Sequence, residues 1–152
     1  MSGSGASAKT SRLSLSGSQR FAAALGCIFC ASLLAVAAWL TPSVYGHGTH
    51  TQLGLPSCPW PQTVGGPCPT CGMTTAFALA ADGRLVDSFL VQPFGCILAV
   101  LTACGFWASL HIAATGSVAG RIYGKLLLPR VVWTMAGLAV ASWAYKWATW
   151  QS

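Results

Sequence analysis

The sequence contains few charged residues. Lysine, arginine, aspartate and glutamate make up 7% of its 152 residues, whereas an ordinary soluble domain has roughly 25%. Only two acids, Asp82 and Asp87, face eight Lys/Arg, and the net charge is +6. The basic residues gather near the ends of apolar runs, where they orient membrane helices and attract anionic headgroups. We therefore expect an integral membrane protein whose partner is the lipid bilayer and not nucleic acid.

Several features of enzymes and transporters are also missing. No acid–base partner, quinone-site signature or second exterior cysteine pair accompanies the cysteine motif, so the sequence predicts no catalytic residue. No histidine follows Cys71, as covalent c-type haem attachment would require. The apolar runs lack the buried charges and broken helices typical of transporters, apart from Pro93. These absences favour a protein without catalytic activity.

Long apolar runs are present instead. A helix needs about 20 apolar residues to span a bilayer, and the segments 21–40, 93–113 and 131–150 meet that length. We predict an all-α integral membrane protein with three transmembrane helices. The third segment contains Lys146, which lies close enough to its end to extend to the interface as an anchor.

The distribution of charge predicts the orientation. Residues 1–19 are rich in Ser and Gly and are expected to be a disordered cytoplasmic tail, and residues 20–152 form the membrane domain. Basic residues precede the first span and separate the last two, namely Lys9, Arg12, Arg20, Arg121, Lys125 and Arg130. By the positive-inside rule the N-terminus is cytoplasmic and the loop 41–92 is exterior. An aromatic belt is expected at the outer interface, formed by Trp39, Tyr45, Trp143, Tyr145, Trp147 and Trp150.

The first span has an alternative interpretation. Its basic flank, apolar stretch and Ala35-Val36-Ala37 resemble a signal peptide with a cleavage site. The apolar run continues through Leu40, and its length favours an uncleaved anchor. The loop 41–92 is exterior in both cases.

The exterior loop contains three cysteines in the stretch Cys58-Pro-Trp-Pro-Gln-Thr-Val-Gly-Gly-Pro-Cys68-Pro-Thr-Cys71-Gly72. Cys68 and Cys71 have the spacing of a zinc half-site, in which Pro stiffens the turn and Gly permits its backbone angles. Cys58 would be the third ligand. His47 and His50 are the available candidates for a fourth ligand, whereas His111 lies at the opposite end of its span. A disulfide between two of the three thiols is the alternative.

The other four cysteines lie within the spans. Cys27, Cys30, Cys96 and Cys104 are expected to be small apolar residues, because thiolates are disfavoured in hydrocarbon. In the part of the exterior loop that follows the cysteines, apolar periodicity predicts two short helices, over 73–80 and 84–91. Neither can span the bilayer, so we expect both to lie at the membrane interface. Met73, Phe77 and Phe89 would anchor them.

The cysteine motif also resembles a known family. Cys58-Pro59, Gly66-Pro67-Cys68-Pro69-Thr70-Cys71-Gly72-Met73-Thr74, Ala76-Phe77 and Gln92-Pro93-Phe94-Gly95 are similar to domain-of-unknown-function 2752, over about residues 55–113. The resemblance implies a bacterial inner-membrane protein and no established activity. In that family an Arg commonly follows the motif's second Thr, where this chain has Thr75.

The sequence favours a small membrane protein without catalytic activity. Its cysteine knuckle would be held by zinc or a disulfide, and would serve as a structural module or bind an unidentified membrane protein. A membrane thiol–disulfide oxidoreductase is the alternative, in which Cys68 or Cys71 attacks and Cys58 resolves.

Overall fold

The computed structural model describes residues 17–116 and 129–150, and within them every regular element is helical. The elements are α2 (Gly17–Trp39), η2 (Thr49–Leu53), α3 (Trp60–Val64), α4 (Met73–Ala81), α5 (Leu85–Val91), α6 (Pro93–Thr115) and α8 (Pro129–Ala148). Residues 1–16 of the predicted tail lie outside the described residues. Residues 17–19, which were also predicted to belong to the tail, form the start of α2. The basic residues Arg121 and Lys125 also lie outside the described part.

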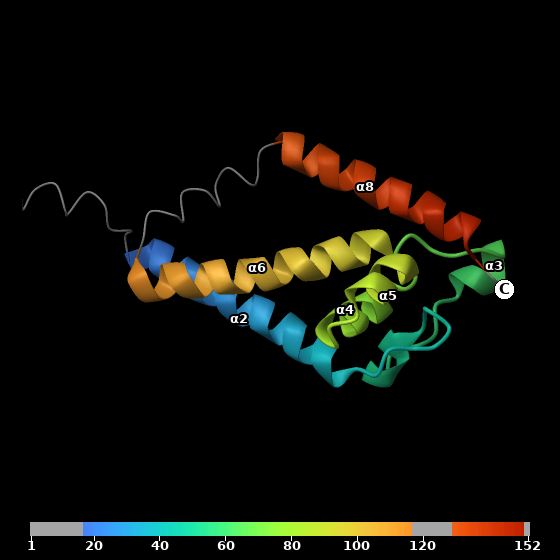
Figure 1. Ribbon diagram of the computed structural model, residues 1–152, viewed down its shortest axis with the longest axis horizontal. Helices are drawn as coiled ribbons and strands as arrows, with labels where there is room; N and C mark the ends of the chain where they lie inside the picture. Colours follow the sequence, from blue (N-terminus) through green and yellow to red (C-terminus); the bar gives the residue numbers. More distant parts are fainter. Residues whose placement is uncertain (1–16, 117–128, 151–152) are drawn as a thin grey trace, which may run out of the picture.

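Two helices, α2 and α6, form the long axis of the molecule and lie side by side (Figure 1). Both have the length and apolar composition needed to cross a membrane. They run antiparallel, because the Arg20 guanidinium at the start of α2 donates to the carbonyl of Ala113 near the end of α6, at 3.0 Å. A cation at a helix C-terminus also interacts favourably with the helix dipole.

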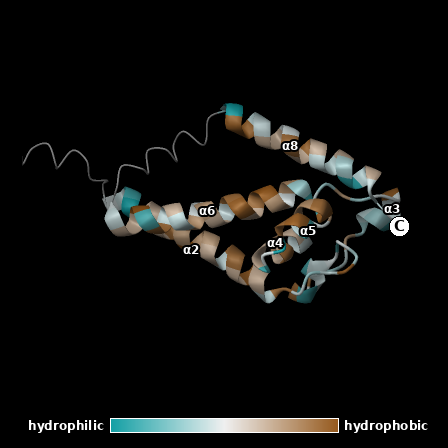
Figure 2. Cartoon of the chain, in the orientation of Figure 1, coloured by the Kyte–Doolittle hydropathy of each residue, from teal (hydrophilic) through white to brown (hydrophobic). Residues whose placement is uncertain are grey.

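The helix α8 corresponds to the third predicted span but is less apolar. Figure 2 shows α8 paler than α6 over much of its length, and α8 is not among the helices apolar enough to count as a candidate span. The structure thus establishes two membrane-length apolar helices, and the third span stays a prediction.

The two short helices predicted after the cysteine motif are α4 and α5. Thr75, Ala76, Ala78 and Leu79 are buried on α4, which packs against both α2 and α6. The packing is close: a methyl group at Gly95 of α6 would lie 2.9 Å from the Ala76 Cβ. Small residues allow this approach of the two backbones. The helix α4 therefore belongs to the core of the bundle.

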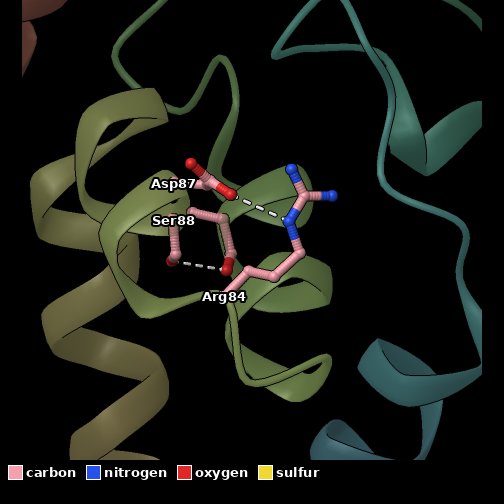
Figure 3. A network of polar contacts seen from close by, with 4 residues as sticks. Arg84, Asp87 and Ser88 are labelled. Carbon is pink, nitrogen blue, oxygen red and sulfur yellow. Dashed lines mark hydrogen bonds and ion pairs between the residues drawn. The ribbon is translucent and has the colours of Figure 1, made fainter.

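The corner between α4 and α5 is held by polar contacts (Figure 3). Ser88 donates from its buried hydroxyl to the Ala76 carbonyl at 2.7 Å, and Arg84 forms an exposed ion pair with Asp87 at 2.8 Å. The buried hydrogen bond fixes α5 across α4, whereas an exposed i,i+3 ion pair contributes little. The outer side of α5 is apolar, and Phe89 is 51% exposed there.

The segment between α2 and α3 is tied to this core. Gln52 brackets Thr41, accepting from its N–H at 3.1 Å and donating to its carbonyl. The hydroxyls of Thr49 and Thr75 lie 2.8 Å apart, and both residues are almost fully buried. The glycine-containing segment 45–50 thus includes the start of a 3-10 helix that contacts α4.

The helix α8 contacts the rest of the protein through its C-terminal half. The Phe94 N–H donates to Ser142 at 3.1 Å, and the Tyr145 hydroxyl donates to the Leu90 carbonyl at 3.1 Å. Near its start α8 is exposed, with Trp133 at 76%. Figure 1 shows α8 diverging from α6 toward that end. Among the described residues, the contacts of α8 lie at the end nearest the three cysteines.

Candidate metal centre

Three cysteine sulfurs meet at the end of the bundle. Cys58 comes from the segment before α3, and Cys68 and Cys71 from the turn before α4. Their sulfur atoms all lie within 4.8 Å of one another. Ligands at about 2.3 Å from a tetrahedral zinc ion would place the sulfurs about 3.8 Å apart. Cys58 precedes Cys68 by ten residues, and Cys68 precedes Cys71 by three. The folded chain thus brings the three sulfurs to nearly the separation that binding of one metal ion requires.

The local turn explains why Cys68 and Cys71 face each other. The Cys71 N–H donates to the Cys68 carbonyl at 3.0 Å, and the Cys68 N–H donates to the Cys71 sulfur at 3.3 Å. Gly72 then takes a φ of 87°, a left-handed conformation that L side chains rarely adopt. A Cβ at Gly72 would lie 2.7 Å from the Gly46 carbonyl oxygen. Both the backbone angle and the available space require glycine at this position.

The two thiols of the turn differ in acidity. Burial by itself would raise the pKa of Cys68, but hydrogen bonds with Cys71, Thr70 and Cys58 outweigh it and hold that pKa below 9.0. Burial, the hydrogen bond with Cys68 and the charges of the neighbouring thiolates raise the pKa of Cys71 to about 12. Their sulfurs lie 3.0 Å apart. Of the two neighbouring thiols, Cys68 therefore has the lower pKa.

The two histidines line the same cavity as the cysteines. This cavity has a volume of about 500 Å³, and its walls include His47, His50, Cys58, Cys68 and Cys71. Neither imidazole belongs to the group of mutually close ligand atoms, which consists of the three sulfurs. The His50 Nε2 lies 3.2 Å from the Pro56 carbonyl oxygen, and the His47 ring stacks on Trp150 with centroids 4.9 Å apart. Ligation by either histidine stays a prediction.

His47 has the protonation state that a metal ligand needs. Burial, followed by the positive charge of Lys146, lowers the pKa of His47 from its ordinary value of 6.5. The ring is therefore neutral at pH 7. The third histidine, His111, is exposed near the C-terminal end of α6, away from the cysteine turn, as the sequence predicted.

One face of α8 covers the cysteine loop. Residues 143, 146 and 147 share one face of the helix, and Trp150 follows just beyond the end of α8 at Ala148. The Trp143 indole donates to the Pro67 carbonyl at 3.0 Å, and a Cβ at Gly66 would clash with the Trp147 ring. Tryptophans expected in an interfacial belt therefore also pack against the loop. The spacing of these residues in the sequence indicates that they share a helical face, but it does not indicate what this face contacts.

Two polar residues near the turn were not predicted as parts of the site. Lys146, interpreted from the sequence as an interfacial anchor, is only 8% exposed, and its ammonium donates to the Val91 carbonyl at 3.0 Å. The ammonium is thus directed into the protein, where the Gly46 carbonyl is its second acceptor, and the role of an interfacial anchor stays a prediction. Gln92 is 1% exposed and donates to the Pro69 carbonyl at 3.3 Å. Through this hydrogen bond Gln92 stabilises the Cys68–Cys71 turn.

The remaining cysteines lie on the two long helices. Cys27 and Cys30 belong to α2, and Cys96 and Cys104 belong to α6. Cys96 is buried and its sulfur lies 3.6 Å from the Leu85 carbonyl oxygen, whereas Cys104 is exposed on its helix. None of the four joins the three-sulfur group in the described part of the chain. Substitutions of these four cysteines therefore provide controls for substitutions of the three loop cysteines.

Comparison with known proteins agrees with the motif. The family model described as "Protein of unknown function (DUF2752)" matches residues 58–107, which run from the first cysteine of the centre into α6. The predicted resemblance to this family is confirmed. No curated protein and no solved structure shows a significant match to the chain. The centre must therefore be interpreted from its own geometry.

Proposed function

We propose that this protein is a three-span membrane protein whose exterior cysteine centre binds one zinc ion through Cys58, Cys68 and Cys71. The observation that carries the proposal is the convergence of three sulfurs within 4.8 Å of one another. A closed structural zinc site has four protein ligands, so His47 or His50, which line the cavity, would supply the fourth. The role is structural: the metal holds the loop 41–92 in one conformation.

The surface of this loop supports a partner-binding role. Several apolar side chains outside the long helices remain exposed, namely Val44, Tyr45, Leu55, Trp60 and Val64. A loop held by a metal loses less entropy when a partner binds than a flexible loop does. We propose that it presents these side chains to another membrane protein at the outer face of a bacterial inner membrane.

The metal content of detergent-purified protein tests the zinc centre. We expect about one equivalent of zinc per chain and thiols at positions 58, 68 and 71 that resist alkylation until a chelator is added. After chelation, Cys68 should react first as the pH rises, with half-maximal reaction below pH 9.0, because its pKa is lowered. Cys71, with a pKa of about 12, should react last. Mass spectrometry of the alkylated peptides would identify each site.

A thiol–disulfide oxidoreductase is the second candidate, and one observation favours it. The sulfurs of Cys68 and Cys71 lie 3.0 Å apart, and Cys68 is the more acidic thiol. The Cys68 thiolate would attack a substrate disulfide and release one substrate thiolate. Cys58 or Cys71 would then attack the mixed disulfide and release the other, so that two electrons pass to the substrate. Metal-free protein whose Cys68 reacts rapidly before any chelator is added would favour this function over zinc.

The three-span topology has its own test. The described basic residues Arg20 and Arg130 lie at the starts of α2 and α8, and an α8 of 20 residues is about 30 Å long, enough to cross the hydrocarbon core. An impermeant maleimide should label Val44→Cys in intact cells, since Val44 is 94% exposed in the loop. Gly17→Cys, where a side chain meets no atom within 4 Å, should be labelled only after permeabilisation. The reverse pattern would overturn the orientation.

A further inference from the structure

Lys146 is a buried cation with no carboxylate partner among the residues that the structure describes. It is 8% exposed, and its ammonium donates to two neutral carbonyls, that of Val91 at 3.0 Å and that of Gly46 at 3.5 Å. Neutral carbonyls satisfy hydrogen bonds but do not neutralise the charge. A buried charge is costly unless an opposite charge lies near it.

The acids of the chain do not provide that opposite charge. The sequence has only two, Asp82 and Asp87. Asp87 pairs with Arg84 at 2.8 Å, which is the only ion pair within residues 17–116 and 129–150. Asp82 is exposed at the end of α4. Among residues 17–116 and 129–150, then, no carboxylate balances the charge of Lys146, and an anion of another kind is needed there.

The position of the ammonium indicates which anion this is. A Cβ at Gly72, the residue after Cys71, would lie 3.3 Å from the Lys146 nitrogen. The ammonium also lies close enough to interact electrostatically with the Cys71 sulfur and with His47. It therefore lies directly against the cysteine turn, on the side where α8 packs.

A metal centre at this turn would carry the missing charge. A divalent ion with three thiolates has a net charge of −1, and a neutral imidazole as fourth ligand does not change it. Within the part of the chain that the structure describes, Lys146 is the buried cation beside this centre. Lys146 and the anionic centre would each lack a counter-charge alone. Together, the +1 charge of the ammonium and the −1 charge of the centre cancel.

We propose that Lys146 is the counter-cation of the Cys58–Cys68–Cys71 metal centre and that α8 positions it there. The inference rests on the zinc centre proposed above. Two neighbours on the same face hold the helix in place, since Trp143 donates to the Pro67 carbonyl and Trp147 packs on Gly66. Docking of α8 and binding of the metal are therefore coupled, because the Lys146 ammonium and the anionic metal centre stabilise each other's charge.

Three variants test this role in the full-length protein in detergent. Lys146→Gln keeps an N–H donor for the two carbonyls but removes the charge, whereas Lys146→Arg keeps both. Arg130→Gln removes a charge from the other end of the same helix and serves as the control. Every variant carries the same C-terminal tag, so that the terminal carboxylate is equally far from position 146 in all of them. Zinc affinity is measured by competition with a chromophoric chelator at pH 7.

We expect Lys146→Gln to weaken zinc binding about tenfold or more, because the lost attraction acts across a buried, poorly screened separation. Lys146→Arg should stay within about threefold of the parent protein, and Arg130→Gln should not differ from it. The thermal midpoint of zinc-loaded Lys146→Gln should fall, whereas that of the chelator-treated protein should not. A lysine that served only as a structural strut would instead lower both midpoints equally.

Each failure has a separate meaning. If the parent protein binds no zinc, the proposed metal centre and the counter-cation are both excluded. If the parent protein binds zinc and Lys146→Gln binds it with the same affinity, the centre stands and the counter-cation role is overturned. Equal loss of zinc affinity in Lys146→Gln and Arg130→Gln would also overturn it, since the effect would then not depend on the position of the charge.

Discussion

Replacement of Cys58, Cys68 or Cys71 by serine should abolish stoichiometric zinc binding in each case. The three sulfurs lie within 4.8 Å of one another and would share one ion, so the loss of any one leaves an incomplete site. We expect the zinc content to fall from about one equivalent to below about 0.1. The amount of protein in the membrane should fall similarly for all three variants, because residues that act as a unit fail together. Elemental analysis and quantitative immunoblotting measure the two effects.

The cysteines of α2 and α6 provide the matched controls. Cys27→Ser on α2 and Cys104→Ser on α6 change the same atom at positions outside the three-sulfur group. Both should retain full zinc content and near-normal abundance. If Cys58→Ser retained zinc while the other two lost it, Cys58 would not be a ligand, and the centre would have to be completed by other residues.

Replacement of Gly72 by alanine should be the most damaging change that leaves every sulfur in place. Gly72 has a φ of 87°, and a Cβ there would lie 2.7 Å from the Gly46 carbonyl oxygen, which is backbone and cannot rotate away. The left-handed backbone alone costs an alanine about 1–2 kcal/mol. Displacement of the backbone around residue 46 should add roughly another 1–3 kcal/mol. The free energy of unfolding, measured by denaturant titration in detergent, should fall by the sum.

Gly54→Ala separates these two causes. Gly54 has a φ of 76°, but a Cβ there meets no atom within 4 Å. It should show the backbone cost alone and retain zinc. Gly72→Ala should lose both stability and zinc affinity, because the displaced turn carries Cys71. Equal effects of the two substitutions would mean that the contact with Gly46 does not constrain the centre.

Features with a strong local cause could be predicted from the sequence. The second span was predicted at 93–113 and is α6, Pro93–Thr115, because proline suits the first turn of a helix and an apolar run follows it. The helix predicted from Met73 is α4, Met73–Ala81. The turn at Cys68–Gly72 also follows from its own residues. In each case the controlling interactions lie within a few residues of one another.

Other local features were missed because their signals conflict. Helix α3, Trp60–Val64, lies in a stretch with two prolines, which suggested a stiff loop. Pro59 and Pro61 lie at the start of that helix, where a missing N–H leaves no hydrogen bond unmade. The helix α2 likewise begins at Gly17, several residues before the apolar run that marked the predicted span. Apolarity indicates the span and does not set the first helical residue.

The cysteine spacing by itself determined that three thiols would share a loop and that Cys68 and Cys71 would face each other, because proline and glycine restrict a turn of only five residues. The sequence suggested Cys58 as a third ligand, but only the tertiary structure decided that its sulfur lies beside the other two and that Lys146 lies against the turn. Lys146 and Gly46 are 100 residues apart in the chain. Such a contact depends on how complete helices pack, and no short-range pattern carries that information. A helical face that contains two tryptophans and a lysine looks the same in sequence whether it faces lipid headgroups or a metal-binding loop.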